Sequence, residues 1–169
     1  SVTVQMGRVS FDSAKIPVVG APREVIREQL AVDGETLQFT SATVGNPHCV
    51  VERPGTTTAD VHRLGPLIEW HSNFPERTNV QFLAVRDRAN IAIEIWERGA
   101  GYTLASGSSS SAAAAVAHRL GLVDRDVTVH MPGGRITINI DHNYGITMTG
   151  PVTRVADGTM AAEMLEDMQ

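Results

Sequence analysis

SGSSSSAAAAVAHRL, residues 106–120, decides the fold that we expect for this chain. Alanine favours helix, serine suits the start of a helix, and Gly121 suits its end. The run from Ala112 to Ala117 has no polar face, and a helix that is apolar all round is normally buried. We therefore expect a central helix enclosed by strands, with its serine end opening onto a cavity.

The start of this helix has a possible chemical use. The first backbone N–H groups of a helix lack internal partners and carry the positive end of the helix dipole, so they can hold a carboxylate or a phosphate. The serines can equally do no more than cap a core helix, or form a flexible low-complexity patch. The segment alone leaves these alternatives open.

Strand-forming segments lie on both sides of this helix in the sequence. Alternating or β-branched runs predict strands at residues 2–6, 37–44, 49–52, 80–85, 91–96, 127–131, 135–140, 146–149 and 152–155. Residues 58–70 have helical spacing, with Gly65 and Pro66 leaving one helix or two open. No linker divides the chain, so we expect one antiparallel-rich α+β domain over residues 1–169.

Composition excludes several classes of protein. The chain has 169 residues, of which 42% are hydrophobic, and a formal net charge of -5, so it can bury a core and is not expected to bind nucleic acid or an anionic membrane through charge. No apolar run approaches the roughly 20 residues of a membrane span, and the first residues do not resemble a signal peptide. We expect a soluble, cytoplasmic protein.

The cysteine and histidine content argues against a metal or disulfide framework. The single cysteine, Cys49, excludes an intrachain disulfide and a cysteine-rich zinc site, and it is expected to be a buried small hydrophobe. Six histidines are scattered along the chain without a close ligand motif. No metal is expected.

Two short polar segments carry further chemistry. Residues 45–49, GNPHC, place the amide of Asn46 and the imidazole of His48 in a tight turn, although an Asn-Pro turn is commonly structural. Glu97 and Arg98 follow a predicted strand and either face the cavity or form a mutual salt bridge. Ser106 lacks the flanking glycines of a hydrolase elbow, and no nucleotide-binding glycine motif is present.

Five blocks in the same order resemble the carboxy-terminal half of diaminopimelate epimerases. They are GNPHCV at 45–50, FPERTNV at 74–80, ERGAGYTLASG at 97–107, MPGGR at 131–135 and MTGP at 148–151. The likeness runs from about Val2 to about Gly158. It implies two similar domains, each a curved sheet wrapped around a central buried helix. This chain corresponds to the second domain, so the amino-terminal domain is an expected partner missing from the sequence.

The resemblance also implies an activity. Such an enzyme needs no cofactor and inverts the α-carbon of diaminopimelate, an amino acid that supplies lysine and peptidoglycan precursors. One group removes the α-proton while a group on the opposite face supplies a proton, and in this family both groups are cysteines, one from each domain. The implied catalytic positions are Ser106, at the family's cysteine position, His48 and Glu97. The implied substrate-binding residues are Asn46, Asn79, Glu97, Arg98, Gly107 and Ser108.

Departures from the family pattern keep other functions open. Serine has no anion comparable to a cysteine thiolate and needs a separate base, so Ser106 is compatible with a non-catalytic domain that binds an amino acid or a partner protein. Ser109 replaces a glycine, and Tyr102 stands where the family often has glutamate, which suits a racemase for another amino acid. An uncovered domain interface is expected to cause self-association.

Overall fold

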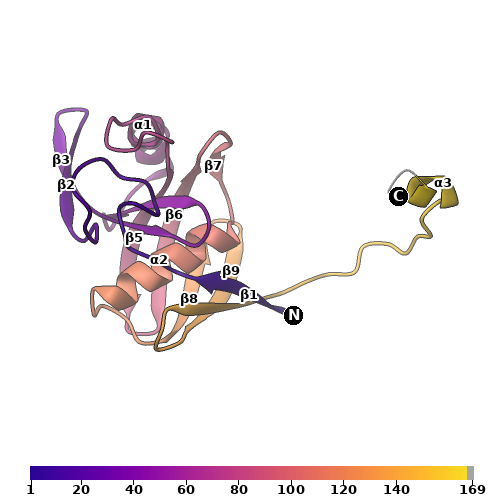
Figure 1. Cartoon of the computed structure of the whole chain (residues 1–169). Helices are drawn as coiled ribbons and strands as arrows, with labels where there is room; N and C mark the ends of the chain where they lie inside the picture. The colour runs from indigo at the N-terminus through magenta and orange to yellow at the C-terminus, as the bar shows by residue number, and fades with distance from the viewer. Residues whose placement is uncertain (167–169) are drawn as a thin grey trace.

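The computed structural model describes residues 1–166, so the last three residues of the expected domain lie outside the described residues (Figure 1). The described chain contains ten strands and three helices. The strands are β1 (Val2–Arg8), β2 (Glu28–Val32), β3 (Glu35–Thr43), β4 (Pro47–Glu52), β5 (Asn79–Asp87), β6 (Asn90–Glu97), β7 (Gly101–Thr103), β8 (Asp126–Met131), β9 (Gly134–Ile140) and β10 (Gly145–Gly150). The helices are α1 (Thr58–Glu69), α2 (Gly107–Arg119) and α3 (Ala162–Glu166).

The strands form one mixed sheet in the order β1-β10-β9-β8-β6-β5-β4-β3-β2, with β7 paired to β6. The β4–β5 and β6–β8 pairs are parallel, and the other pairs are antiparallel. Both parallel connections contain a helix, because a parallel pair needs a long crossover. The protein is therefore a sheet-rich α+β structure with few helices.

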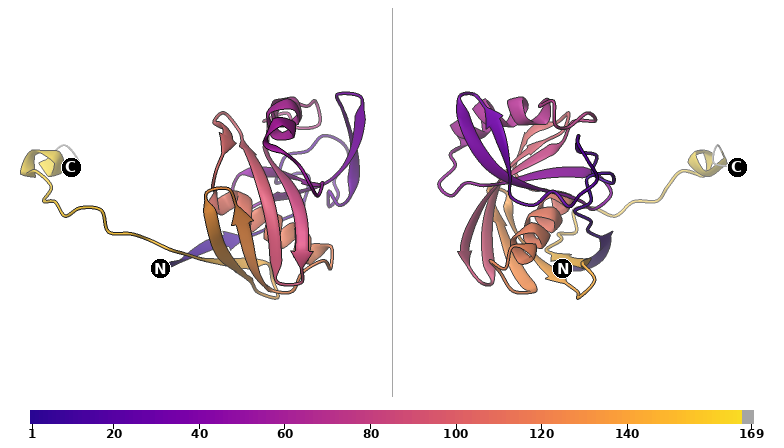
Figure 2. Two further views of the ribbon diagram at one scale, coloured as in Figure 1. Left: turned by 180° about the vertical axis from the view of Figure 1, so that it is seen from behind. Right: turned by 60° about the vertical axis from the view of Figure 1, so that its left-hand side comes forward.

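Helix α2 begins and ends as its sequence indicates. Ser106 is the N-cap, with its side chain accepting a hydrogen bond from the Ser109 N–H. At the other end Gly121 has a φ of 74°, a left-handed conformation that glycine adopts without strain. Every residue from Ser109 to Ala117 is buried. The helix packs against β3 to β6 and β8 to β10, so strands from both halves of the sheet flank it (Figure 2).

A second apolar core lies on the other face of β4 and β5. Along β4, Val50 packs in the core around α2, whereas Cys49 and Val51 pack in the core around α1. Because successive side chains of a strand point to opposite faces, β4 is covered on both sides and carries no exposed apolar position. Cys49 is buried, as the sequence predicts, and burial raises the pKa of its thiol.

Helix α1 is continuous through Pro66. Its start is fixed by a capping box in which Thr57 and Asp60 exchange side-chain and backbone hydrogen bonds. Gly65 lies where the helix contacts the Trp96 side chain, and a β-carbon at this position would come within 2.6 Å of the indole Cγ. Only glycine therefore allows α1 to pack this closely on β6.

The predicted strand at residues 152–155 is wrong. Val152 and Val155 are 62% and 93% exposed, and among the described residues no strand pairs with them, because β1 already occupies the free edge of β10. The segment instead runs away from the sheet to α3 (Figure 1). The sequence patterns did not predict β2, β7 and α3.

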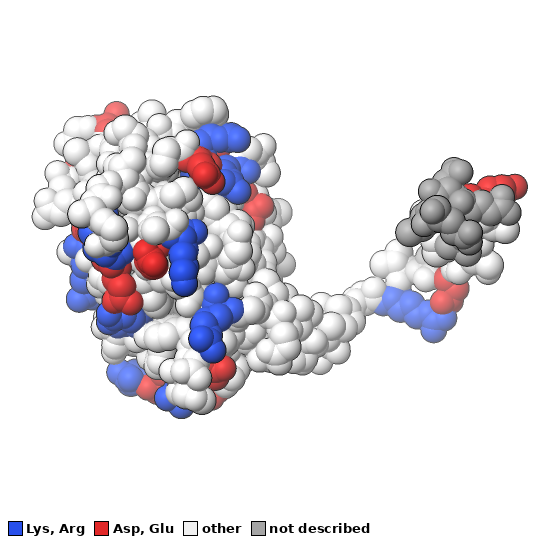
Figure 3. Space-filling view, viewed as in Figure 1, with Lys and Arg blue, Asp and Glu red and all other residues white. Residues whose placement is uncertain are grey.

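Charged residues of both signs are interleaved on the surface. Figure 3 shows Lys and Arg beside Asp and Glu on the body, and an uncharged area where the chain leaves β10. Within residues 1–166, no helix combines the length and apolar content needed to cross a membrane.

Candidate functional site

A buried polar chain connects β4 to the first turn of α2. The His48 ring lies between Asn46 and Gln81, with 3.0 Å from Nε2 to the Asn46 Oδ1 and 3.1 Å from Nδ1 to the Gln81 Nε2. The same Gln81 nitrogen donates to the Ser109 Oγ at 2.9 Å. Since the Gln81 amide donates to Nδ1, the proton of neutral His48 belongs on Nε2 and points to Asn46. One chain of hydrogen bonds thus links Asn46, in the turn before β4, to the start of α2.

The environment of His48 keeps its imidazole neutral. The ring is fully buried, and burial lowers the pKa of His48 from 6.5 to about 3, with the positive charge of Arg98 acting in the same direction. At neutral pH His48 is therefore a hydrogen-bonding group rather than a cation.

Three strand ends place the remaining candidate residues together. His48 of β4 is paired in register with Asn79, the first residue of β5, and Glu97 is the last residue of β6, one position beyond the Val80–Trp96 pair. The Asn79 side chain donates to the Pro47 carbonyl at 2.8 Å and accepts from the Arg98 N–H at 3.0 Å. Asn79 therefore fixes the turn that carries Glu97 and Arg98 against the start of β4.

Glu97 and Arg98 do not pair with each other. The Arg98 guanidinium donates to the Glu76 carbonyl at 2.9 Å. The Glu97 carboxylate forms no hydrogen bond or ion pair with the residues that the structure describes, and it is half-buried. The salt bridge considered from the sequence is therefore not formed, and the Glu97 carboxylate remains available to another group.

The first turn of α2 presents backbone donors. The N–H groups of Gly107 and Ser108 precede the first intrahelical bond, in which the Ser110 N–H donates to the Ser106 carbonyl at 3.1 Å. The turn contains no acidic side chain. Ser109, Ser110 and Ser111 are fully buried, so the serine run is an ordered part of the core. The arrangement suits a carboxylate of a ligand.

A hollow of about 310 Å³ borders the same helix start. Ser106 and Gly107 form one wall, and the others come from β1, β8, β9, β10 and the segment after β10, with apolar Val4, Ile136 and Met148 among them. Asn46, Asn79 and Glu97 are not part of this lining. Asn46 is linked to the first turn of α2 from the β4–β5 side, through His48, Gln81 and Ser109. The helix start therefore stands between an apolar hollow and a polar cluster.

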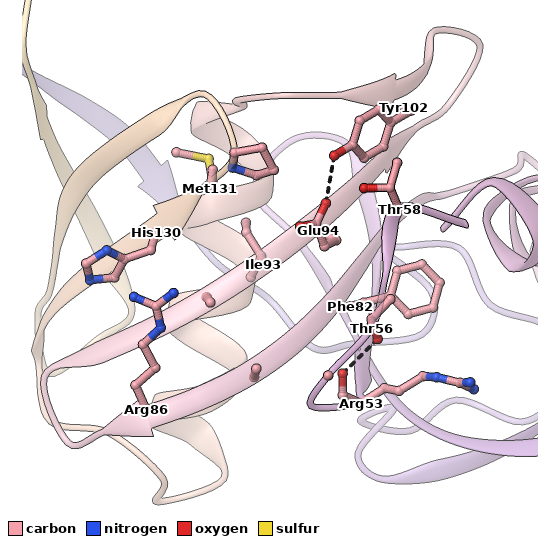
Figure 4. A pocket seen from close by; sticks show the side chains of 14 residues that line it. Arg53, Thr56, Thr58, Phe82, Arg86, Ile93, Glu94, Tyr102, His130 and Met131 are labelled. Carbon is pink, nitrogen blue, oxygen red and sulfur yellow. Dashed lines mark hydrogen bonds between the residues drawn. The ribbon is translucent and has the colours of Figure 1, made fainter. Parts of the chain in front are cut away.

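A second, larger groove does not contain the predicted site. It has a volume of about 480 Å³ and includes Tyr102, whose hydroxyl donates to Glu94 at 2.9 Å (Figure 4). Arg86 and His130 lie next to each other at its other end (Figure 4). Tyr102 packs with the α1 core rather than with Ser106, so this departure from the family pattern lies away from the helix start.

Gln81 was not among the residues predicted from the sequence. The signal was available, since Gln81 is the one polar residue in the run VQFLAV at 80–85, on a strand that is buried on both faces. A polar side chain at such a position must find a hydrogen-bonding partner inside the protein. Within residues 1–166, no group of three His, Cys, Asp or Glu side chains is arranged to hold a metal ion.

Comparisons with known proteins identify a family for this chain. The sequence profile of the family described as "Diaminopimelate epimerase" matches residues 40–155. The chain is 53% identical over 164 residues to "Diaminopimelate epimerase 2" of Nostoc sp. and 39% identical over 164 residues to "Diaminopimelate epimerase" of Desulfitobacterium hafniense. Each match covers 97% of this chain and 58% of the relative, so the chain spans less than two thirds of their length.

Solved structures give the same fold at low sequence identity. A hydroxyproline epimerase from Agrobacterium vitis matches 86% of this chain and 48% of its own, with a TM-score of 0.59 and 17% identity. A probable proline racemase from Agrobacterium radiobacter matches 91% of this chain and 53% of its own, with a TM-score of 0.59 and 15% identity. With the matched profile and the 53% identical relative, these findings lead to one conclusion: this chain belongs to the diaminopimelate epimerase family.

Proposed function

We propose that this chain is the carboxy-terminal part of a cofactor-independent epimerase that inverts the α-carbon of diaminopimelate. One observation carries the proposal: a chain of hydrogen bonds through Gln81 and His48 joins Asn46 to the first turn of α2, which contains no acidic side chain. Membership of the family supplies the substrate class. The activity implies a place in lysine and peptidoglycan-precursor synthesis, in the cytoplasm and without pyridoxal phosphate.

The finer form of the fold belongs to this proposal. We infer that the curved sheet wraps around α2 and so fixes the direction of its N-terminal end. This is supported by the complete burial of Ala112 to Ala117 and by the packing of α2 against strands from both halves of the sheet. A fixed helix start can bind a carboxylate without first being ordered, which lowers the entropic cost of binding.

The substrate-binding roles follow from the chemistry of each group. The Gly107 and Ser108 N–H groups bind the α-carboxylate, with Arg98 as a further cation for the ligand. Asn79 retains one N–H and Asn46 retains its NH₂ group for the ligand, since each uses only part of its amide within the protein. Glu97 accepts a hydrogen bond from the ligand's ammonium group.

The proton-transfer position on this half of the site is Ser106. Its hydroxyl accepts a hydrogen bond from the Ser109 N–H at 3.4 Å, so it lies at the positive end of the α2 dipole. There a cysteine would be stabilised as a thiolate, whereas a serine requires a base. His48 and Glu97 are the residues proposed to lie beside Ser106 in this proton transfer. Glu97 has a free carboxylate, and neutral His48 orients Asn46.

We further propose that an amino-terminal domain covers the apolar hollow at the helix start and supplies the second acid/base group. Val2, Val4 and Val152, which line it, are between 40% and 62% exposed. Such a cluster is typical of a surface that a partner covers. Without that partner, the chain is expected to self-associate through this surface and to have negligible epimerase activity.

The test joins this chain to the amino-terminal part of the Nostoc relative and measures deuterium incorporation at the α-carbon of diaminopimelate in D₂O. Ser106→Cys is expected to exchange the α-proton faster than the Ser106 protein, because only the cysteine supplies an accessible anion. A folded Ser106→Cys protein that binds diaminopimelate without any exchange would contradict the epimerase proposal.

That last result would favour a second function, an amino-acid-binding domain without catalysis. The observation behind it is Ser106 itself, which caps α2 and leaves this half of the site without a thiol, since the sole cysteine, Cys49, is buried in the other core. Diaminopimelate binding that is equal in the Ser106 and Ser106→Cys proteins, with no exchange in either, is the expected result for a binder.

A further inference from the structure

We propose that Glu69, the last residue of α1, is a positioning residue for the diaminopimelate site, a role that rests on the function proposed above. Glu69 is charged, lies on a different helix from the site, and is only 4% exposed. A carboxylate is almost never buried to this extent unless it is paired. The hydrogen-bonding partners of Glu69 therefore indicate its role.

Three donors converge on this carboxylate. The Gly99 N–H donates to Glu69 Oε1 at 3.0 Å, and the Arg77 guanidinium donates to the same oxygen at 3.2 Å. The Trp96 indole N–H donates to Oε2 at 2.8 Å. Both oxygens are occupied, and hydrogen bonds to a charged acceptor are the strong ones.

Two of these donors flank Glu97 and Arg98, the proposed substrate-binding pair. Trp96 and Gly99 are the residues immediately before and after Glu97 and Arg98 in the sequence. By holding the turn at both ends, Glu69 sets where the Arg98 N–H meets the Asn79 side chain. The carboxylate thus acts on the ligand-binding turn through the backbone and does not itself face the ligand.

The third donor fixes the segment that precedes Asn79. Arg77 has a φ of 61°, a left-handed conformation that is uncommon for a residue with a side chain. Its guanidinium lies over the Trp70 ring at 4.7 Å while it pairs with Glu69. The contacts of α1 therefore compensate an unfavourable backbone conformation two residues before Asn79, and one buried carboxylate anchors both segments of the polar cluster.

The packing of α1 preserves this arrangement. Gly65 lies one helical turn before Glu69, on the same face, and it leaves room for the Trp96 ring. The glycine determines where the indole lies, and the carboxylate binds its N–H. A helix that only covered the sheet would require neither a glycine at position 65 nor a buried carboxylate at position 69.

The test compares Glu69→Gln with Thr57→Ala in the 169-residue chain. Gln has one acceptor oxygen and an NH₂ group that opposes the remaining donors, so it cannot satisfy all three. Thr57→Ala removes the N-cap at the far end of α1 and weakens the same helix without changing any contact of Glu69. If Glu69→Gln does not fold, Glu69→Asp serves instead, because it keeps the charge but withdraws it by one methylene.

The first readout is the ratio of the amide hydrogen exchange rate of Gly99 to that of Ile93, which lies in the centre of β6. The loss of one charge-assisted hydrogen bond is expected to raise this ratio about tenfold in Glu69→Gln. Thr57→Ala is expected to leave the ratio unchanged, because it alters the stability of the whole chain and not of the turn. An unchanged ratio in Glu69→Gln would overturn the proposal.

The second readout is the affinity for meso-diaminopimelate, which is measured from the shifts of the amide resonances of Asn79 and Arg98. We expect it to fall about tenfold in Glu69→Gln and to stay at the wild-type value in Thr57→Ala. A raised exchange ratio with unchanged affinity would overturn the positioning role. If the wild-type chain alone binds no diaminopimelate, the affinity is measured in the protein joined to the amino-terminal part of the Nostoc relative. If that protein also binds none, the proposed function fails and this role with it, while the exchange ratio separately establishes whether Glu69 holds the turn.

Discussion

Acidification is expected to destabilise this protein through His48. The folded protein holds His48 neutral, with a pKa of about 3, whereas the unfolded chain has the ordinary value of 6.5. Between these two values the unfolded state binds a proton that the folded state does not, so stability rises with pH across this interval. The stabilisation is fully present above pH 6.5 and is lost progressively as the pH falls toward 3.

The magnitude follows from the two pKa values. Lowering the pH from 7 to 4.5 favours the unfolded chain by roughly 2.5 kcal/mol through this one group. Carboxylates that are paired in the folded state also titrate over part of this interval, so the effect of His48 must be isolated. His48→Gln provides the control, since its amide can donate to Asn46 and accept from Gln81 but does not take up a proton.

The assay is urea denaturation of both proteins at pH 7, 6, 5 and 4.5. The wild-type chain is expected to lose roughly 2.5 kcal/mol more stability than His48→Gln over this interval. Parallel losses in the two proteins would refute the reasoning. So would an NMR titration in which the folded His48 ring has a midpoint near its ordinary pKa, because the burial argument would then be wrong.

Three further expectations follow from the packing. Gly65→Ala is expected to cost about 2–4 kcal/mol in urea denaturation, because the added methyl meets the Trp96 ring and displaces its hydrogen bond to Glu69. Gly107→Ala should cost less, because its methyl meets the flexible side chains of Met148 and Met6, and equal losses in the two variants would contradict this explanation. Gln81→Leu is expected to cost about 1–3 kcal/mol by leaving His48 Nδ1 without its donor, whereas Gln38→Leu on the exposed face of β3 should have little effect. The isolated chain is expected to self-associate in sedimentation experiments, with Val4→Lys reducing the association; a monomer at every concentration would argue against a covered apolar surface.

Much of the fold could be predicted because its elements carry local signals. The alanine run with its serine cap identifies α2, and alternation identifies β5, β6, β8 and β9 within two residues at each end. Glu28–Val32 was missed because its alternation is short and follows a loop with two prolines. Residues 152–155 have strand-forming side chains, yet propensity alone does not supply a partner strand.

The site could be predicted only where the residues that form it are close in the sequence. The Asn46 turn, the Glu97–Arg98 pair and the Ser106 helix start each form a short motif. Gln81 and Glu69 act through partners that are 28 to 33 and 8 to 30 residues away, and no local pattern encodes such contacts. Both are single polar residues on apolar faces, which is the one sequence signal that could have identified them.

The start of α2 is proposed to bind the carboxylate of an amino acid beside the polar cluster of β4, β5 and β6. The most direct measurement titrates the ¹⁵N-labelled chain with meso-diaminopimelate and with 1,5-diaminopentane, which has the same amines but no carboxylates. We predict saturable shifts of the Gly107 and Ser108 amides with diaminopimelate alone, together with Asn79. Equal shifts with both compounds, or shifts confined to the groove at Tyr102 and His130, would contradict the account.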